Sequence, residues 1–392
     1  MGPLHALAIL LSLVAQEPRT ETVRIPGTDL KFEMVSVPGG KAKLGSPADE
    51  PGRRPDERPV HEVELQPFWM SRTEVTWDAF VKYFENRKLV KVDGVTRPSP
   101  PYEPPHGKMG VGSHPAVSMR WHGAIGYCEW ASTLTGRRFR LPTEAEFEYA
   151  ARAGATGAGP ANAEEVAWFE SNAQKKTQLT GTKKPNAFGL QDLMGNVWEY
   201  ALEFHDGPEY DPVLRGGGWN TPGAELRFAA RQQIRSEWYE RDPNRPRSMW
   251  WLTDGTFVGF RVVCFADAPK KDQDAYLAKL EVTGLKAVEG TKGNARVTGT
   301  LKNAGDRTLS EVELTVYYTD EDGKPVFEDN KARPCFSKAW PVLANSDQPG
   351  DQPKALKPGE SRTFQLDVPQ PFDLDVELTK VGARASAVQF SN

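Results

Sequence analysis

Residues 183–200 read KKPNAFGLQDLMGNVWEY, and this stretch decides the fold class of the first 265 residues. It is rich in Gly and Asn, carries a Pro, and shows no long hydrophobic periodicity, which is typical of irregular backbone. Irregular backbone leaves many peptide groups outside regular ladders, so bound cations and aromatic packing are useful there. We therefore expect an α+β domain with little regular secondary structure.

Aromatic residues are concentrated in this part of the chain. Ten of the eleven tryptophans precede residue 270, and only Trp340 follows it. Because a chain of 392 residues exceeds what one hydrophobic core usually serves, we expect two domains. The first is predicted over residues 22–265, with a polar, Pro-interrupted linker at 266–275.

Three segments of the first domain predict helices: residues 77–86, 121–135 and 144–152. Thr76 is a plausible N-cap of the first helix, and Thr143 with Glu146 forms a capping-box pattern at the start of the third. Cys128 lies on the apolar face of the second helix, which favours an inert, buried thiol.

The second domain, residues 276–392, shows alternation with period two. Val297, Gly299 and Leu301 alternate with polar residues, and the same holds between Val312 and Tyr318. Turn-forming residues separate these runs. The pattern predicts an all-β sandwich, and the text VTGTLKNAGDRTLSEVELTVYYTDEDGK resembles immunoglobulin-like modules of bacterial surface proteins.

The N-terminus has the pattern of an export signal. Residues 1–16 hold a short apolar run that ends in small residues and is too short to span a bilayer. We expect a signal peptide and a secreted or periplasmic protein; a buried N-terminal helix is the alternative. No later apolar run approaches about 18 residues, so no transmembrane span is predicted.

Charge and cysteine content exclude several function classes. The chain carries 49 Lys and Arg against 53 Asp and Glu, a formal net charge of −4, so nucleic acid is not an expected partner. Its three cysteines (Cys128, Cys264, Cys335) are too widely spaced for a disulfide framework or a Cys-x-x-Cys metal site.

Six motifs occur in a characteristic order: MVSVPGGKAKLGS (34–46), HEVELQPFWMSRTEVTWDAF (61–80), HPAVSMRWHG (114–123) with RLPTEAEFEYAARAG (140–154), the opening stretch, RGGGWN (215–220) and GTFVGFRVV (255–263). Together they resemble the formylglycine-generating enzyme, or sulfatase-modifying factor, family. The resemblance spans nearly the whole first domain and implies a C-type-lectin-like fold that is often stabilised by calcium. Active members oxidise a cysteine of a sulfatase to formylglycine with molecular oxygen.

The resemblance implies a structural calcium site at Asp192, Gly195, Val197 and Glu199. Carboxylates and carbonyls of one tight loop are oxygen ligands that suit Ca²⁺. In the alternative interpretation Asp192 caps the turn and Glu199 pairs with an arginine. A second family site would begin at Asn172 and Ala173, but no acidic partner is evident downstream.

The family holds copper(I) with two cysteines shortly after its Arg-Gly-Gly-Ser motif. Here the matching segment, residues 215–231, contains Gly218 at the serine position, and no cysteine occurs between Cys128 and Cys264. We call residues 215–231 the degenerate segment. Its residues of interest are Gly218, Trp219, Asn220, Arg227 and Arg231. Because soft thiolates are what copper(I) needs, the segment does not predict copper binding.

Other candidate residues are ambiguous. His114 and His122 lack a third metal ligand and favour ordinary hydrogen bonding. Arginines 227, 231 and 261 favour bridging between loops by bidentate hydrogen bonds over substrate binding. The aromatic stretch 237–251 could line a binding surface or pack against the domain.

These patterns favour an exported, non-canonical member of the family that acts as a binding or accessory protein, with an exported protein or peptide as partner. The alternatives are an active oxidase of the family and another oxidative enzyme on the same fold. Convergent metal ligands near residues 216–219 would favour an enzyme.

Overall fold

The structure is a computed structural model. It describes residues 18–86, 101, 103–204, 212–243, 248, 250–264, 270–289, 294–318, 327–328, 333–334, 336–339, 355–369 and 381–390. The predicted signal peptide, residues 1–16, and Cys335 lie outside these residues.

The three predicted helices are confirmed. They are α1 (Trp77–Glu85), α2 (Trp121–Thr135) and α3 (Glu144–Arg152). Thr76 accepts a hydrogen bond from the Ala79 amide at 3.4 Å, and Thr143 and Glu146 form the capping box at the start of α3. Side-chain caps thus set the beginnings of α1 and α3. A further helix, α4 (Ala163–Val166), spans a single turn.

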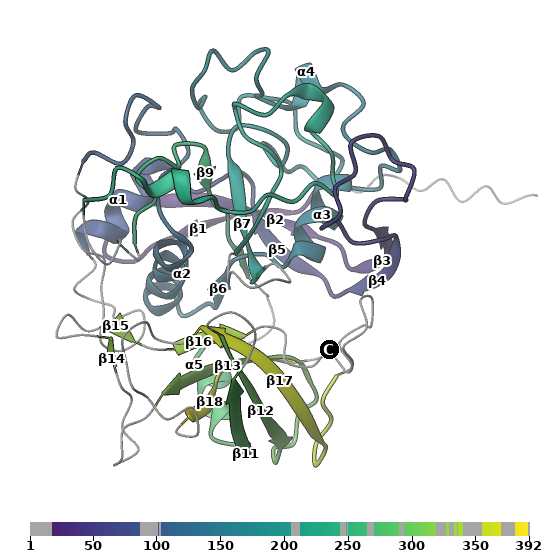
Figure 1. The fold of residues 1–392 in the computed structure, drawn as a ribbon, viewed down its shortest axis with the longest axis vertical. Coiled ribbons are helices and arrows are strands. Elements are labelled where there is room, and N and C mark those ends of the chain that lie inside the picture. Colours follow the sequence, from purple (N-terminus) through teal and green to yellow (C-terminus); the bar gives the residue numbers. More distant parts are fainter. Residues whose placement is uncertain are drawn as a thin grey trace, which may run out of the picture.

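Three small sheets hold the first domain together. The five-stranded sheet has the order β1 (Thr20–Arg24), β2 (Lys31–Val37), β5 (Phe68–Ser71), β10 (Val263–Cys264), β6 (Phe139–Arg140). A two-stranded sheet pairs β3 (Gly40–Leu44) with β4 (His61–Leu65), and a third sheet has the order β8 (Pro212–Arg215), β7 (Trp198–Phe204), β9 (Val258–Gly259). Figure 1 shows that coil fills much of the space between them. The expected α+β domain with little regular secondary structure is therefore observed.

Aromatic side chains form the larger core of this domain. Phe80 stacks on Tyr127 with ring centroids 6.4 Å apart, and Phe260 and Trp251 meet Phe80 edge to face. Edge-to-face and offset pairs stabilise such a core beyond the burial of apolar area. The strand-poor domain is thus held by aromatic packing, as its tryptophan content indicated.

The described C-terminal residues form two three-stranded antiparallel sheets. One has the order β11 (Leu280–Glu289), β12 (Asn294–Asn303), β17 (Ser361–Pro369), and the other β16 (Phe336–Ala339), β13 (Leu309–Tyr318), β18 (Val381–Phe390). A two-residue pair, β14 (Phe327–Glu328) and β15 (Arg333–Pro334), is separate. The alternation predicted for β12 is observed, since Val297 and Leu301 are fully buried. The immunoglobulin-like resemblance stays a prediction.

The expected linker contains a helix. Within 266–275, the described residues belong to α5 (Lys270–Leu277), whose Tyr276 is buried and hydrogen-bonds with Asn303 and Arg307. Burial of one large aromatic side chain orders this polar segment, which its composition alone could not show. In the described part of the chain, no helix is long and apolar enough to cross a membrane.

Candidate functional site

The predicted calcium loop is a tight turn that leads into β7. Asp192 and Asn196 both have positive φ, and Gly195 has φ 90°. A Cβ at Gly195 would lie 2.3 Å from the Trp168 carbonyl oxygen, so only glycine fits there. The turn brings Asp192 and Glu199 into the interior, where both are buried.

Glu199 is held by an arginine. Nε and Nη2 of Arg261 each donate to one of its carboxylate oxygens at 2.7 Å, and both side chains are buried. Arg261 also donates to the carbonyls of Ser71 and Gln191, at 3.2 Å and 3.0 Å. The arginine pairing given above as the alternative for Glu199 is therefore present.

Asp192 is only partly satisfied. Its Oδ2 accepts a hydrogen bond from the Gly181 amide at 2.6 Å, whereas its buried Oδ1 has no hydrogen-bond partner among the described residues. Burial raises the pKa of Asp192 to about 6. A buried carboxylate oxygen that has no hydrogen-bond partner can act as a ligand to a cation.

Glu74, which the sequence analysis did not single out, is the third acidic group of this cluster. It is 2% exposed, and neither of its carboxylate oxygens has a hydrogen-bond partner within the described residues. Burial and the neighbouring charges of Asp192 and Glu199 raise its pKa well above the usual range. We name Glu74, Asp192, Glu199 and Arg261 the acidic cluster; it contains three carboxylates and one cation.

The acidic cluster fits calcium in part. Its excess negative charge and the free oxygens of Glu74 and Asp192 suit a hard divalent ion. Both carboxylate oxygens of Glu199, in contrast, already accept hydrogen bonds from Arg261. The described residues contain no group of three His, Cys, Asp or Glu side chains placed to hold one ion. Carbonyls, such as those of Gly195 and Val197, would have to complete the ligand set.

The second predicted calcium position is occupied by protein hydrogen bonds. The Asn172 side chain accepts from the Phe169 amide and donates to Glu164 and to the Ala167 carbonyl. The Ala173 carbonyl accepts from the side chain of Gln178. The Asn172 side-chain oxygen and the Ala173 carbonyl oxygen therefore each accept a hydrogen bond from the protein, and a calcium ion at this position stays a prediction.

The degenerate segment adjoins the acidic cluster. Glu199 of β7 pairs in register with Arg215 of β8, the Gly195 amide donates to the Gly216 carbonyl at 2.9 Å, and Trp219 donates to the Asn196 carbonyl at 2.7 Å. Backbone hydrogen bonds therefore join the two predicted sites into one continuous structure.

Within that structure, Gly218 is buried and Asn220 is exposed. The Gly218 amide donates to the Thr221 hydroxyl at 2.8 Å, and a Cβ at Gly218 would lie 3.2 Å from both Trp198 and Asn220. Trp219 donates its indole N–H to the Thr256 carbonyl at 3.2 Å. A side chain at position 218 would require these neighbours to shift by a few tenths of an ångström.

The two arginines of the segment bind carboxylates of distant loops. Arg227 donates to Glu57, to Glu50 and to the Gly52 carbonyl. Although burial opposes it, the guanidinium of Arg227 keeps the pKa of Glu57 below its usual value. The pairing agrees with the expected bridging role of Arg227.

Arg231 and Arg215 share Glu144 on α3. Arg231 donates to both of its carboxylate oxygens at 2.9 Å, and Arg215 donates to Glu144 at 3.1 Å and to Glu148 at 2.8 Å. These charges keep the pKa of Glu144 below its usual value despite its burial. Both guanidinium groups are thus engaged with protein partners.

A family comparison gives this geometry a context. The model of the "Sulfatase-modifying factor enzyme 1-like domain" matches residues 22–264, which is more than half of the chain. The chain belongs to this family. The match covers the acidic cluster and the whole degenerate segment.

Relatives of this sulfatase-modifying factor domain have different names and functions. The chain is 31% identical to the serine/threonine-protein kinase pkn1 of Chlamydia caviae, over 59% of this chain and 40% of the kinase. It is 28% identical to the inactive C-alpha-formylglycine-generating enzyme 2 of Mus musculus, over 61% of this chain and 88% of that protein. The formylglycine-generating enzyme of Streptomyces coelicolor is also 28% identical, over 47% of this chain and 78% of the enzyme. This chain thus spans less than half of the kinase's length.

Among solved structures, PvdO from Pseudomonas aeruginosa aligns with a TM-score of 0.47 and 28% identity. The alignment covers 60% of this chain and 95% of PvdO.

The cysteines of this sulfatase-modifying factor domain lie in its core. Cys128 and Cys264 are both buried, and neither is part of a disulfide bond. Burial raises the pKa of Cys264 to about 12, and the thiol lies 2.9 Å from Nη2 of Arg137. Burial of Cys128 confirms the prediction made from its position on α2.

The remaining candidates have structural contacts. Nδ1 of His114 lies 3.2 Å from the Thr177 hydroxyl, and His122 packs edge to face on Trp250 with centroids 5.3 Å apart. In the aromatic stretch, Trp238 packs on Phe257, and Trp250 and Trp251 are buried. The described tryptophans of this stretch pack against the domain, in agreement with one of the two alternatives given for it.

Proposed function

We propose that this chain is a non-catalytic member of the sulfatase-modifying factor family that acts as a binding or accessory protein. The observation that carries the proposal is the composition and bonding of the degenerate segment. Arg227 and Arg231 form ion pairs with buried carboxylates, and the segment contains no cysteine. These groups hold the fold together and leave no soft ligand for copper(I).

The two thiols within the described residues do not replace the missing pair. Cys128 and Cys264 belong to the hydrophobic core. A thiol must ionise to hold copper or attack a substrate, and burial opposes ionisation. The similarity to the murine inactive C-alpha-formylglycine-generating enzyme 2 supports the same interpretation.

We propose in addition that the acidic cluster binds one structural calcium ion, with Asp192, Glu199 and the carbonyls of Gly195 and Val197 as ligands. Glu199 would bind the ion through a lone pair that its bonds to Arg261 leave open, and Glu74 would add negative charge beside the ion. The unpaired oxygens of Glu74 and Asp192 support this proposal. A calcium ion would supply charge balance to three buried carboxylates that one arginine cannot neutralise.

Export and a C-terminal immunoglobulin-like module complete the proposal. Residues 1–16 would direct the chain to a secreted or periplasmic location, where the all-β domain would act as an interaction or spacer module and a protein or peptide would be the partner. The two three-stranded sheets and their buried faces support the module.

The decisive experiment compares this protein with an active formylglycine-generating enzyme. Both are loaded with copper(I) and incubated in oxygen with a sulfatase-type Cys-x-Pro-x-Arg peptide, which is then analysed by mass spectrometry. We expect no copper(I) bound at the degenerate segment and no aldehyde on the peptide. Copper-dependent aldehyde formation would establish the alternative, an active oxidase with an unexpected ligand set.

A further inference from the structure

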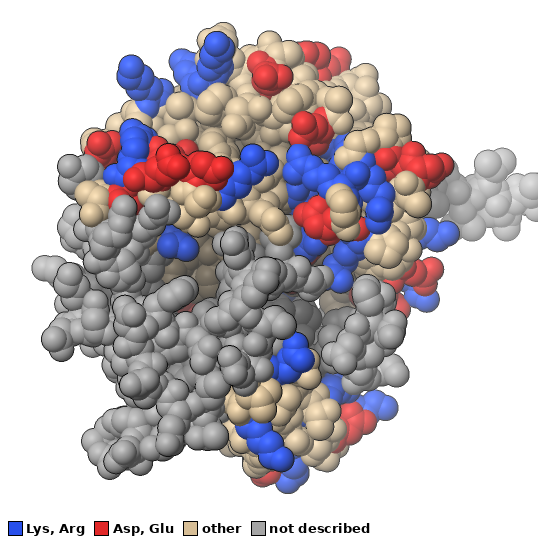
Figure 2. All heavy atoms as spheres, in the orientation of Figure 1, with Lys and Arg blue, Asp and Glu red and all other residues tan. Residues whose placement is uncertain are grey.

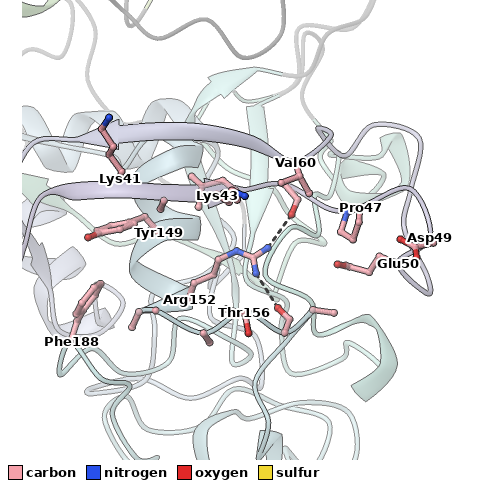
Figure 3. Close-up of a pocket in the computed structure, with 18 of the residues that line it drawn as sticks. Lys41, Lys43, Pro47, Asp49, Glu50, Val60, Tyr149, Arg152, Thr156 and Phe188 are labelled. Carbon is pink, nitrogen blue, oxygen red and sulfur yellow. Dashed lines mark hydrogen bonds between the residues drawn. The ribbon is translucent and has the colours of Figure 1, made fainter.

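A groove of about 850 Å³ lies beside β3, remote in sequence from the degenerate segment (Figure 3). Residues 41–45 form one wall, and the small residues 153–158 form the other. Tyr149 and Phe188 line one end, with their ring centroids 5.6 Å apart. A groove of this size is typical of sites that bind a small molecule or a short peptide.

One wall of the groove is the edge of a sheet. Strand β3 belongs to a two-stranded sheet and pairs only with β4. Within the described residues, the backbone of 40–44 makes no hydrogen bond to any segment other than β4. Alternate amide and carbonyl groups of β3 are therefore available to an added strand.

Arg152 fixes the width of the groove. It donates to the Gly45 carbonyl on one wall at 3.1 Å and to the Gly157 carbonyl on the other at 3.0 Å. Its Nε also donates to Glu148 at 2.9 Å, and Glu148 accepts from the Gly45 amide at 2.8 Å. Because Arg152 holds both walls in place, binding of a ligand would cost little free energy for ordering the site.

The charges on β3 specify what would pair with it. Lys41 and Lys43 are exposed on one face of the strand, directly across from Glu64 and Glu62 of β4. Ala42 and Leu44 point to the other, more buried face. The two lysines thus have the acidic strand β4 on one side, where Nζ of Lys41 lies 4.0 Å from Glu62, and the unpaired edge of β3 on the other.

We propose that the edge of β3 binds an extended peptide segment of a protein partner, in which acidic residues alternate with apolar ones, as a third strand of this sheet. The acidic residues lie beside Lys41 and Lys43, as those of β4 already do, and opposite charges on neighbouring strands attract. The apolar residues lie on the Tyr149 and Phe188 side. A five-residue strand of about 17 Å matches the length of β3.

The β3 groove specifies the class of partner for the proposed binding role, and it rests on that proposed function only for this link. It uses no residue of the degenerate segment or of the acidic cluster. Copper-dependent aldehyde formation would overturn the non-catalytic assignment and leave the groove unaffected, whereas failure of the peptide experiment would overturn the groove alone.

The test uses the full chain and a fluorescein-labelled peptide, acetyl-Ser-Glu-Val-Glu-Leu-Glu-Ser-amide, with fluorescence polarisation as readout. We expect saturable binding that weakens with salt. The double variant Lys41→Glu, Lys43→Glu should bind roughly tenfold more weakly and prefer a peptide with Lys in place of Glu. Lys108→Glu, at an exposed position outside the groove, is the matched control and should bind like the wild type.

Backbone pairing is tested separately from charge. N-methylation of the peptide at one alternate set of residues should abolish binding, and methylation of the other set should not. Thr156→Trp should block the groove without lowering the melting temperature. The proposal is overturned if the peptide shows no saturable binding up to about 1 mM, if both methylated peptides bind like the parent, or if Lys108→Glu weakens binding as much as the double variant.

Discussion

Arg261 donates to both carboxylate oxygens of Glu199 at 2.7 Å, in a pair that is buried on both sides. The same guanidinium is the only cation of the acidic cluster, so removing it would leave the buried Glu199 carboxylate without the partner that binds both of its oxygens. Arg261→Met should lower the free energy of unfolding by about 3–5 kcal/mol. Chemical denaturation measures this change, with Arg72→Met at the exposed Glu33 pair as the control, where about 0–1 kcal/mol is expected. Equal effects of the two variants would contradict a special role of Arg261.

Calcium should stabilise the fold through the acidic cluster. A ligand that binds only the native state adds about 2.7 kcal/mol at one hundred times its Kd. Stripping calcium with a chelator should therefore lower the melting temperature of the wild type, and calcium should restore it. Asp192→Asn and Glu199→Ala should abolish this response, whereas Glu165→Gln, at an exposed carboxylate, should retain it. An unchanged melting curve of a protein proven free of metal would exclude the calcium proposal.

The sequence could predict the helices and the strand alternation because their signals are local. Caps such as Thr76 and Thr143 lie within three residues of the amides that they bind. The period-two pattern of β12 likewise needs no distant information. The positions of these elements followed from short-range physical chemistry.

The acidic cluster could be predicted only in part, because its members are far apart in the chain. Glu199 and Arg261 are 62 residues apart, and nothing near Glu74 in the sequence shows that it is buried beside Asp192. The β3 groove depends on Arg152 and Gly45, 107 residues apart, and could not be seen in the sequence at all.

Acid should weaken the contact between the degenerate segment and the 50–57 loop. Arg227 keeps the pKa of Glu57 below that of an exposed glutamate, about 4.3. The pair therefore adds stability above that pH and loses it as the pH falls through the lower, folded-state pKa. Glu57→Gln should cost about 3 kcal/mol near pH 7, and its stability should converge with that of the wild type in acid. Denaturation curves of the wild type and of Glu57→Gln between neutral pH and pH 3 measure the two free energies of unfolding. A difference between them that stays constant with pH would contradict the role given to the Arg227–Glu57 pair.

The C-terminal region should fold alone, provided that α5 is included. Tyr276 contributes a buried ring and hydrogen bonds with Asn303 and Arg307, so it belongs to the core of that region. A fragment of residues 270–392 should unfold cooperatively. A fragment of residues 280–392 should be less stable by about 2–4 kcal/mol, the cost of losing a buried aromatic side chain. Broad melting of the longer fragment in calorimetry would show that it needs the first domain.

The two core cysteines should contribute to stability and not to chemistry. Burial raises the pKa of Cys264 to about 12, so at pH 8 its thiol stays protonated, and Cys128 is enclosed by the apolar residues of α2. Neither thiol should react with a disulfide reagent until the protein unfolds, because the thiolate is the reactive form. Replacing both with serine should lower the melting temperature, since each change buries a hydroxyl, and should leave the peptide of the oxidase assay as unmodified as before. Titration with and without denaturant, on the wild type and on each single variant, separates the two cysteines. Rapid reaction of Cys264 in the folded protein would show a reachable thiolate, and would bring back the possibility of a redox reaction at β10.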